Sequence, residues 1–315
     1  MLDIVTIGET MVAFMPTEPE FIRYAPLFSK RTAGAESNVA IGVAKLGMKS
    51  GWISKLGNDE FGEFILRELR GEGVDTSQVI RSDSYPTGIM FKQFASGSET
   101  SVFYYRLGSA ASSMTLKDIP HDYVAQSKIL YLSGITPALS PECRKTAFEI
   151  VRVAREAGVM VCFDPNIRLK LWSKEDAKEC LTGLLHQSDI VLIGQDEAQM
   201  LLGETEPKQI VTALREAGVK KIAVKQGAKG AVVADETAVV QISSYPVQVV
   251  DNIGAGDAFS AGFLCGLLEK KTIRECGEMG CMMGALAVSS RGDVEGLPNR
   301  EQLERYLNNS ERVFR

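Results

Sequence analysis

Short apolar runs rich in β-branched residues alternate with amphipathic stretches along most of the chain. Six such runs predict buried strands, namely LDIVTIG, SGWISKLG, KILYLSG, VMVCFD, DIVLIG and KKIAVKQG. Segments between them, such as 36–47 and 141–158, have the apolar spacing of helices. Because this alternation is typical of βαβ units, we expect a three-layer α/β/α fold around a mainly parallel sheet that is covered on both faces.

Two segments break the alternation, residues 10–33 and about 86–108. Both predict extended chain with no helix, and the second predicts the strands TGIMFKQFA and SVFYYRLG joined by the polar turn 96–99. Together they predict a small β-sheet projecting from the main one. The chain contains no repeat and no linker long enough to divide it, so we expect one domain over 1–315 with the small sheet inserted at these two places.

The composition is that of an ordinary globular protein, with 45% hydrophobic and 24% charged residues and a net charge of −5. This charge argues against a nucleic-acid partner. The stretch Met279–Ser290 is shorter than the roughly 20 apolar residues of a membrane-spanning helix. The first residues, MLDIVTIGE, include Asp3 and no basic region, so they predict a buried strand and not a signal peptide. We therefore expect a soluble, cytoplasmic protein with no membrane partner.

Cysteine and histidine offer little material for chemistry. The six cysteines are scattered without a C-x-x-C pair, which favours buried thiols over disulfides or a zinc site. Only His121 and His186 are available for a histidine-based site. If the protein is an enzyme, we expect its base to be a carboxylate.

The densest candidate for chemistry is the segment DNIGAGDAFSAGFLCGLLEKK at 251–271. The small residues Gly254, Ala255 and Gly256 open an apolar helix, whose first backbone N–H groups are unpaired and lie at the positive end of the helix dipole. Such a helix start predicts an anion site. Asp257 follows in the first turn, where it is either a base beside the anion or only a helix cap.

A second glycine-rich segment, AGAESNVAIGVAKLG at 33–47, is followed by ISKLGNDEFG at 53–62. Here the chain leaves a loop at Gly34 and enters a helix that Gly47 ends. These segments resemble the first signature of the PfkB, or ribokinase-like, family of sugar kinases, and DNIGAGD resembles the second. The resemblance extends over essentially the whole chain, since KQGAKG at 225–230 and SRGD at 290–293 fall where the family has corresponding segments.

The resemblance implies a ribokinase-like fold, in which the small sheet is a lid over the sugar, and ATP- and Mg²⁺-dependent phosphorylation of a carbohydrate hydroxyl. It implies that Asp257 is the base and that Gly254, Ala255 and Gly256 form the anion hole. It makes K⁺ a candidate monovalent cofactor, and it implies a homo-oligomer formed through the lid. The implied nucleotide contacts are Lys225, Gly227, Lys229, Gly230, Gly254 and Gly256, and Glu197 is implied at the metal although its segment reads Gly194-Gln195-Asp196-Glu197.

Positively charged residues indicate the class of substrate. Ala13 stands where fructokinase-like members have an Asp. Tyr104 and Arg106 are two apart on a predicted strand and so share a face, and Arg168 follows another strand in DPNIR. Two arginines favour an acidic substrate, although each alone could be a surface residue or a salt-bridge partner. The residues implied at the substrate are Gly34, Asn38, Tyr104, Arg106, Arg168, Asp257 and Asp293.

Within the family, the combination of G-A-E-S-N, F-Y-Y-R-x-x-S-A-A, S-G-I-T-P-A-L-S and D-P-N-x-R resembles the kinases of 2-keto-3-deoxygluconate. This implies transfer to the 6-hydroxyl, giving 2-keto-3-deoxy-6-phosphogluconate. The alternatives are a family kinase for fructose or another keto-aldonate, and a non-catalytic sensor of sugar acids or nucleotides. A nicotinamide-dependent oxidoreductase is disfavoured because no G-x-G-x-x-G follows the first strand.

Overall fold

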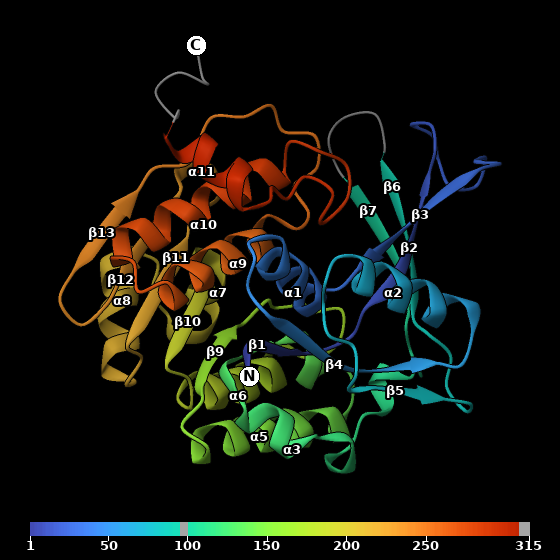
Figure 1. Ribbon diagram of the computed structural model, residues 1–315, viewed down its shortest axis with the longest axis horizontal. Helices are drawn as coiled ribbons and strands as arrows, with labels where there is room; N and C mark the ends of the chain where they lie inside the picture. The colour runs from blue at the N-terminus through green and yellow to red at the C-terminus, as the bar shows by residue number, and fades with distance from the viewer. Residues whose placement is uncertain (95–99, 309–315) are drawn as a thin grey trace.

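A large sheet of nine strands runs through the molecule in the order β13-β12-β11-β10-β9-β8-β1-β4-β5 (Figure 1). The computed structural model describes residues 1–94 and 100–308. All neighbouring strands pair in parallel except β11 with β12 and β12 with β13. The strands are β1 Leu2–Ile7, β4 Ser50–Gly57, β5 Val79–Ser82, β8 Ser127–Ser133, β9 Met160–Asp164, β10 Ile190–Gly194, β11 Lys221–Lys225, β12 Ala231–Ala234 and β13 Val239–Ile242. The six predicted strands are confirmed, and the three additional ones lie at the edges.

Helices cover both faces of this sheet, which confirms the three-layer α/β fold. Successive strand residues point to opposite layers, so Ile4 packs into one apolar core and Val5 into the other. The first core is covered by α1 Ala35–Lys45, α2 Glu60–Gly71, α9 Ala255–Leu268, α10 Ile273–Ala287 and α11 Arg300–Asn308. The second is covered by α3 His121–Ala125, α5 Pro141–Glu156, α6 Lys174–Leu185, α7 Gln195–Leu202 and α8 Pro207–Glu216, with the single-turn α4 Ile135–Ala138 at the end of β8.

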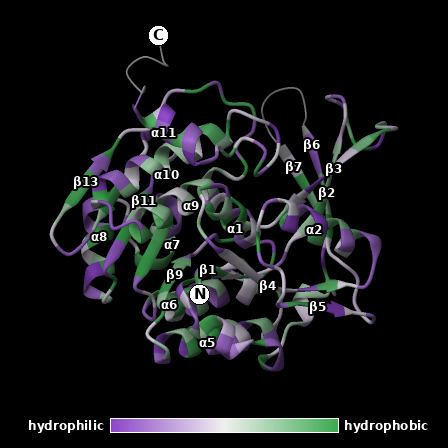
Figure 2. Ribbon diagram, viewed as in Figure 1, coloured by the Kyte–Doolittle hydropathy of each residue, from purple (hydrophilic) through white to green (hydrophobic). Residues whose placement is uncertain are grey.

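Burial explains why the parallel strands read as continuous apolar runs. Both of their faces are covered, so Trp52, Tyr131 and Phe163 are fully buried although they come from three different strands. Figure 2 shows hydrophobic residues along strands such as β10 and β11, with hydrophilic residues more frequent on the outer helices and loops. All six cysteines are buried and free, which confirms the prediction of core thiols.

The small sheet has four strands in the order β3-β2-β6-β7, namely β2 Met11–Pro16, β3 Phe28–Ala33, β6 Ile89–Phe94 and β7 Thr100–Tyr105. It projects beside the large sheet (Figure 1), which confirms the predicted second sheet. The predicted turn 96–99 lies outside the described residues. Met11, Ala13 and Met90 form a small core of their own on the inner side. The opposite side of the sheet carries an aromatic row, in which Phe14 is paired with Phe91 and Phe91 with Phe103.

Among residues 1–94 and 100–308, no helix is both long and apolar enough to cross a bilayer.

Candidate active site

The loop before α9 bends sharply at Gly254, which has a φ of +84° and forms the N-cap of the helix. A Cβ at this position would lie 2.6 Å from the carbonyl oxygen of Asp293, so only glycine fits both the backbone conformation and the space. The first N–H groups of α9 have no intrahelical acceptor and converge at this turn. The predicted anion-binding geometry at Gly254, Ala255 and Gly256 is therefore present in the backbone.

Asp257 is the third residue of α9, and it faces the same opening as the free N–H groups. Its Oδ2 accepts a hydrogen bond of 2.8 Å from Nδ2 of Asn38 on α1. Burial raises the pKa of Asp257 to about 7, with the negative charges of Asp164 and Asp293 adding to the effect and the Asn38 hydrogen bond and Lys225 opposing it. A carboxylate with this pKa can both accept and release a proton near neutral pH.

Lys225 ends strand β11 beside the anion-binding turn. Its Nζ donates a hydrogen bond of 2.6 Å to Oδ2 of Asp164, the last residue of β9. A Cβ built on Gly256 would lie 3.6 Å from this Nζ, so the ammonium stands next to the first turn of α9. Burial alone would lower the pKa of Lys225, but the nearby carboxylates of Asp164 and Glu197 outweigh it and raise that pKa. The lysine is therefore a fixed positive charge beside the start of α9, where the anion site is predicted.

Asp164 was not among the predicted site residues. It is 1% exposed, and its Oδ2 also lies 3.3 Å from the hydroxyl of Ser260, while its buried Oδ1 has no hydrogen-bond partner in the described part of the chain. The signal that could have found it is its position in D-P-N at the carboxyl end of a parallel strand, where ligands collect in α/β sheets.

A cavity of about 360 Å³ opens above Asp257, and we call it the charged cavity. It lies between the small sheet and the ends of the central strands. All seven predicted substrate residues line it: Gly34, Asn38, Tyr104, Arg106, Arg168, Asp257 and Asp293. Gly34 is required there because a Cβ would lie 2.4 Å from the carbonyl oxygen of Glu9. The structure thus brings together residues that are more than 200 positions apart in sequence.

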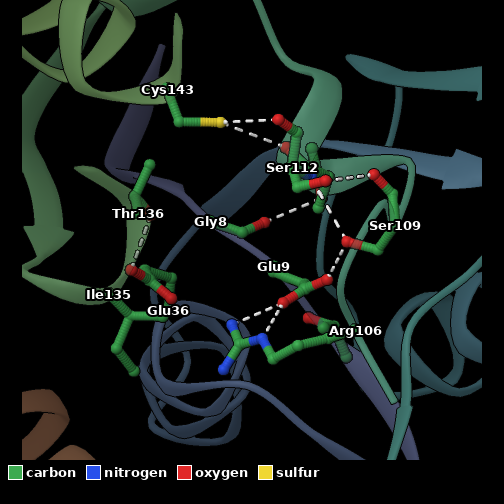
Figure 3. A network of polar contacts seen from close by, with 12 residues as sticks. Gly8, Glu9, Glu36, Arg106, Ser109, Ser112, Ile135, Thr136 and Cys143 are labelled. Atoms are coloured by element: carbon green, nitrogen blue, oxygen red, sulfur yellow. Dashed lines mark hydrogen bonds and ion pairs between the residues drawn. The ribbon is translucent and has the colours of Figure 1, made fainter. Parts of the chain in front are cut away.

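The two predicted arginines differ in their surroundings. Arg106 is buried, and its guanidinium forms an ion pair with the buried Glu9, with Nε 2.6 Å from Oε2 (Figure 3). Ser109 donates to the other oxygen of Glu9. Arg168 is exposed at the rim of the charged cavity, and no ion pair with it is formed by the described residues. The salt-bridge alternative therefore applies to Arg106, and Arg168 is the arginine whose charge is available.

A second buried pair was not foreseen from the sequence. Lys92 on β6 is 1% exposed and forms an ion pair with Asp293, whose other oxygen accepts from Nδ2 of Asn38 at 3.3 Å. The same Asn38 nitrogen also donates to Asp257. A single lysine in the strand sequence IMFKQF carries no sign that its side chain is buried.

A second cavity, of about 630 Å³, adjoins the first, and we call it the apolar cavity. The two share Lys225, Asn252 and Gly256. Of the predicted nucleotide residues, Lys225, Gly227, Gly230 and Gly256 line the apolar cavity, Gly254 lines the charged one, and Lys229 is exposed and lines neither. The remaining wall of the apolar cavity consists largely of Tyr245, Pro246, Val247, Val249, Ala255, Phe259, Cys281, Ala285 and Val288.

Two carboxylates, those of Glu197 and Asp251, are candidate ligands for the predicted Mg²⁺ and monovalent cation. Both oxygens of Glu197 accept backbone N–H groups, from Ile167 at 2.9 Å and from Gly194 at 2.7 Å. The described residues contain no cluster of three or more Asp, Glu, His or Cys side chains able to enclose a metal ion. Asp251 is 3% exposed and its Oδ2 is buried without a hydrogen-bond partner in the described residues, which suits a small cation held there.

The start of α9 lies where the apolar cavity meets the charged one, and the carboxylate of Asp257 stands beside it. A helix start suits a phosphoryl group and a nearby carboxylate suits a base, so the fold and the site are those of a phosphotransferase. Residues 1–300 match the model of the pfkB family carbohydrate kinases. The chain belongs to this family and is a carbohydrate kinase.

Relatives and solved structures of this family cover nearly the whole chain. The 2-dehydro-3-deoxygluconokinase of Bacillus subtilis is 40% identical over 97% of this chain and 95% of its own length. The 5-dehydro-2-deoxygluconokinase of Clostridium perfringens is 28% identical over 97% and 92%. A sugar kinase from Pyrococcus horikoshii, solved in complex with ATP, is 32% identical with a TM-score of 0.84 over 99% and 100% of the two chains. A putative ribokinase II from E. coli, solved with ATP and Mg²⁺, shares the fold with a TM-score of 0.92 at 24% identity over 98% and 100%.

Proposed function

We propose that this kinase transfers the γ-phosphoryl group of ATP to the 6-hydroxyl of 2-keto-3-deoxygluconate, the compound also named 2-dehydro-3-deoxygluconate. The observation that carries the proposal is the charged cavity, which has a carboxylate of raised pKa at its floor and, at its rim, the guanidinium of Arg168, which forms no ion pair with the residues that the structure describes. A sugar acid has a hydroxyl at one end and a carboxylate at the other, so it matches this polarity. The relative with 40% identity carries the same activity in its name.

In the proposed reaction, Arg168 holds the substrate carboxylate and Tyr104 covers the sugar chain from the small sheet. Arg106 offers hydrogen bonds from a guanidinium whose net charge Glu9 already balances. Asp257 takes the proton of the attacking 6-hydroxyl, and the oxygen then forms a bond to the γ-phosphorus of ATP while the bond from that phosphorus to the β,γ-bridging oxygen breaks and ADP leaves. The first N–H groups of α9 and the ammonium of Lys225 stabilise the charge on the transferred group.

The apolar cavity would hold the nucleotide. Its walls of glycine and apolar side chains suit the flat faces of an adenine ring, and its border with the charged cavity at Lys225 and Gly256 directs the phosphates toward Asp257. Mg²⁺ neutralises charge on the phosphates when bound. Glu197 would act on it through water, because both of its oxygens already accept backbone N–H groups.

We also propose a monovalent cation such as K⁺ at Asp251. The backbone N–H of Asp251 donates to the carbonyl of Val288, and its own Oδ1 accepts from the N–H of Ile253, which leaves Oδ2 for a cation. A cation there would fix the loop that leads into the anion-binding turn. If the cation binds there, kcat measured in a K⁺ buffer should be higher than kcat measured in a tetramethylammonium buffer of equal ionic strength.

A homo-oligomer formed through the small sheet is supported by the aromatic row on its outer side. Phe103 is 48% and Tyr105 is 65% exposed, next to Phe91 and Phe14 in the same row. Exposed aromatic side chains in a contiguous patch favour burial against a partner, and a second copy of the same sheet offers a matching surface. Light scattering of the wild type and of the Phe103→Ser variant would measure this association.

A kinase for a different sugar acid is the second candidate. The relative from Clostridium perfringens is named for 5-dehydro-2-deoxygluconate, which is also a keto acid that Arg168 could bind. The two acids differ in the position of the keto group, so side chains in the middle of the charged cavity decide between them. Met90 and Ile135 line this cavity, and their side chains carry no polar atom that would select one carbonyl position.

The product of the reaction tests the proposed function. Incubation with ATP, Mg²⁺ and 2-keto-3-deoxygluconate should give a phosphate monoester whose ³¹P resonance is split by the two protons at C6. No new ester, or an ester at another carbon, would reject the proposed transfer.

A further inference from the structure

A buried lysine of the small sheet is linked to the proposed base. Lys92 is surrounded by protein, and the ion pair of its ammonium with Asp293 joins the small sheet to the segment after α10. Asp293 is in turn 3.3 Å from the amide nitrogen of Asn38, which is 2.8 Å from Asp257. Lys92 does not line the charged cavity, so it acts through these residues and not on the substrate.

We propose that Lys92 is a positioning residue for the proposed base: by holding and neutralising Asp293, it fixes Asn38 and keeps Asp257 able to ionise. This inference rests on the role of Asp257 given above and deepens it. It assigns to the small sheet a part in the chemistry besides covering the sugar.

The first part of the argument is geometric. A single Asn38 nitrogen serves two carboxylates, and its two donor hydrogens can point one to each only while both carboxylates stay in place. Lys92 holds Asp293 from the side opposite to Asn38 by binding its other oxygen. Loss of the ammonium would free Asp293 to move, and Asn38 would lose one of its two fixed acceptors.

The second part is electrostatic. The negative charge of Asp293 is one of the causes that raise the pKa of Asp257, and Lys92 offsets that charge. The groups facing Asp257 come from every element packed around it: Asn38 from α1, Asp164 from β9, Lys225 from β11, Tyr131 from β8 and Asp293 from the segment after α10. Without Lys92, Asp293 would lose the ammonium that pairs with it, while Lys225 would remain paired with Asp164.

Three variants test the charge relation through the pH dependence of kcat/KM. Lys92→Met keeps the apolar stem of the side chain and removes the charge, so the acidic limb of the profile should move up by about half to one pH unit. Asp293→Asn leaves the positive charge of Lys92 without a partner near Asp257, so the acidic limb should move to lower pH. The double variant removes both charges and should return the limb to within about 0.3 units of wild type, although each single variant loses activity.

The double variant is also the control for folding, because a neutral pair in place of a buried ion pair is tolerated better than either charge alone. If Lys92→Met does not fold, the comparison of Asp293→Asn with the double variant still measures the contribution of Lys92. Shifts of the same sign in both single variants, or an unchanged limb in all three, would overturn the role of Lys92.

The titration of Asp257 in the apo protein separates this inference from the proposed function. Its carboxyl ¹³C resonance, assigned by its absence in Asp257→Asn, should titrate higher in Lys92→Met than in wild type, with no substrate present. If that shift occurs but Asp257→Asn keeps full turnover, the proposed base is wrong and the coupling stands. If Asp257→Asn is inactive and the resonance does not shift, the coupling is wrong and the base stands.

Discussion

The two adjoining cavities are lined by different kinds of side chain. The charged cavity is lined by side chains that carry full charges, among them Asp257, Arg106 and Arg168. The apolar cavity is lined mostly by glycines and small or apolar side chains, and Lys225 is its only Lys, Arg, Asp or Glu among the described lining residues. If the charged cavity binds the sugar acid and the apolar cavity binds the nucleotide, as proposed, the first would select its ligand by charge and hydrogen bonds and the second by shape.

This contrast predicts which substitutions will affect only the sugar substrate and which will affect only ATP. A change in the charged cavity should discriminate between sugar substrates and leave ATP binding nearly intact. A change in the apolar cavity should do the reverse. Changes at the shared border, Lys225, Asn252 and Gly256, should affect both, because the proposed reaction transfers the phosphoryl group across this border.

The largest effect is expected for Asp257→Asn. The amide has the size of the carboxyl group and can still contact Asn38, but it cannot take the hydroxyl proton, so kcat should fall by about 10²–10⁴-fold while the Kd values for substrate and ATP change little. Stopped assays for kcat and calorimetry for the two Kd values measure this. Retention of more than about a third of wild-type kcat would make Asp257 a helix cap and not the base.

The next largest effect is expected at the shared border. Gly256 has ordinary helical backbone and a new Cβ would meet only Nζ of Lys225 at 3.6 Å, so Gly256→Val should fold normally. Its side chain would occupy the path of the phosphoryl group and lower kcat by about 10²–10³-fold. Gly254→Ala is the matched contrast: with φ at +84° and Asp293 at 2.6 Å, it should lower the melting temperature. Normal turnover in a folded Gly256→Val would move the phosphate site elsewhere.

The two arginines should separate binding from stability. Arg168→Ala removes the charge-assisted hydrogen bond that we propose between this exposed side chain and the substrate carboxylate, so KM for the sugar acid should rise roughly 10- to 150-fold with KM for ATP almost unchanged. Arg106→Ala leaves Glu9 buried without its cation and should cost about 3–5 kcal/mol of unfolding free energy. Denaturant titration and steady-state kinetics of both variants measure this difference. Equal destabilisation by the two variants would contradict the contrast between them.

The smallest effect is expected in the apolar cavity. Ala285 lies on α10 and lines this cavity, so Ala285→Leu adds bulk where the adenine is proposed to lie. KM for ATP should rise about tenfold, since a few misplaced methylene groups in an apolar pocket have effects of this size. KM for the sugar acid in saturating ATP should stay within a factor of two. A rise in the sugar-acid KM alone would reverse the assignment of the two cavities.

The sequence was most informative where local backbone geometry determines the structure. Gly254 and Asp257 are three residues apart at a helix start, so their relative positions follow from the helix itself. The same holds for Val39 and Val43 on the buried face of α1 and for Gly47, whose φ of +82° ends that helix. These predictions needed no knowledge of distant contacts.

Long-range pairing could not be predicted in this way. Glu9 lies 97 positions from Arg106, and Asp293 lies 201 positions from Lys92. Whether a charged side chain in a small sheet is buried depends on what packs against the sheet, and the strand pattern does not contain that information. For this reason the sequence left open which of the two arginines forms a salt bridge, and it gave no sign of the buried lysine.

The edge strands show the same limit. β12 and β13 are four residues each and pair antiparallel at the margin of a parallel sheet, so they interrupt the βαβ alternation from which the other strands were predicted. The nine-stranded sheet therefore follows from the sequence in its centre and not at its margins.

The relative kcat/KM of the wild-type enzyme for three substrates tests the central claim most directly. Coupled ADP release should be measured with 2-keto-3-deoxygluconate, with 5-dehydro-2-deoxygluconate and with fructose, which has no carboxylate for Arg168. The account predicts the highest kcat/KM for 2-keto-3-deoxygluconate and, for fructose, a value at least about tenfold lower, the minimum effect of one lost charge-assisted hydrogen bond. Fructose phosphorylated as efficiently as either acid would contradict it.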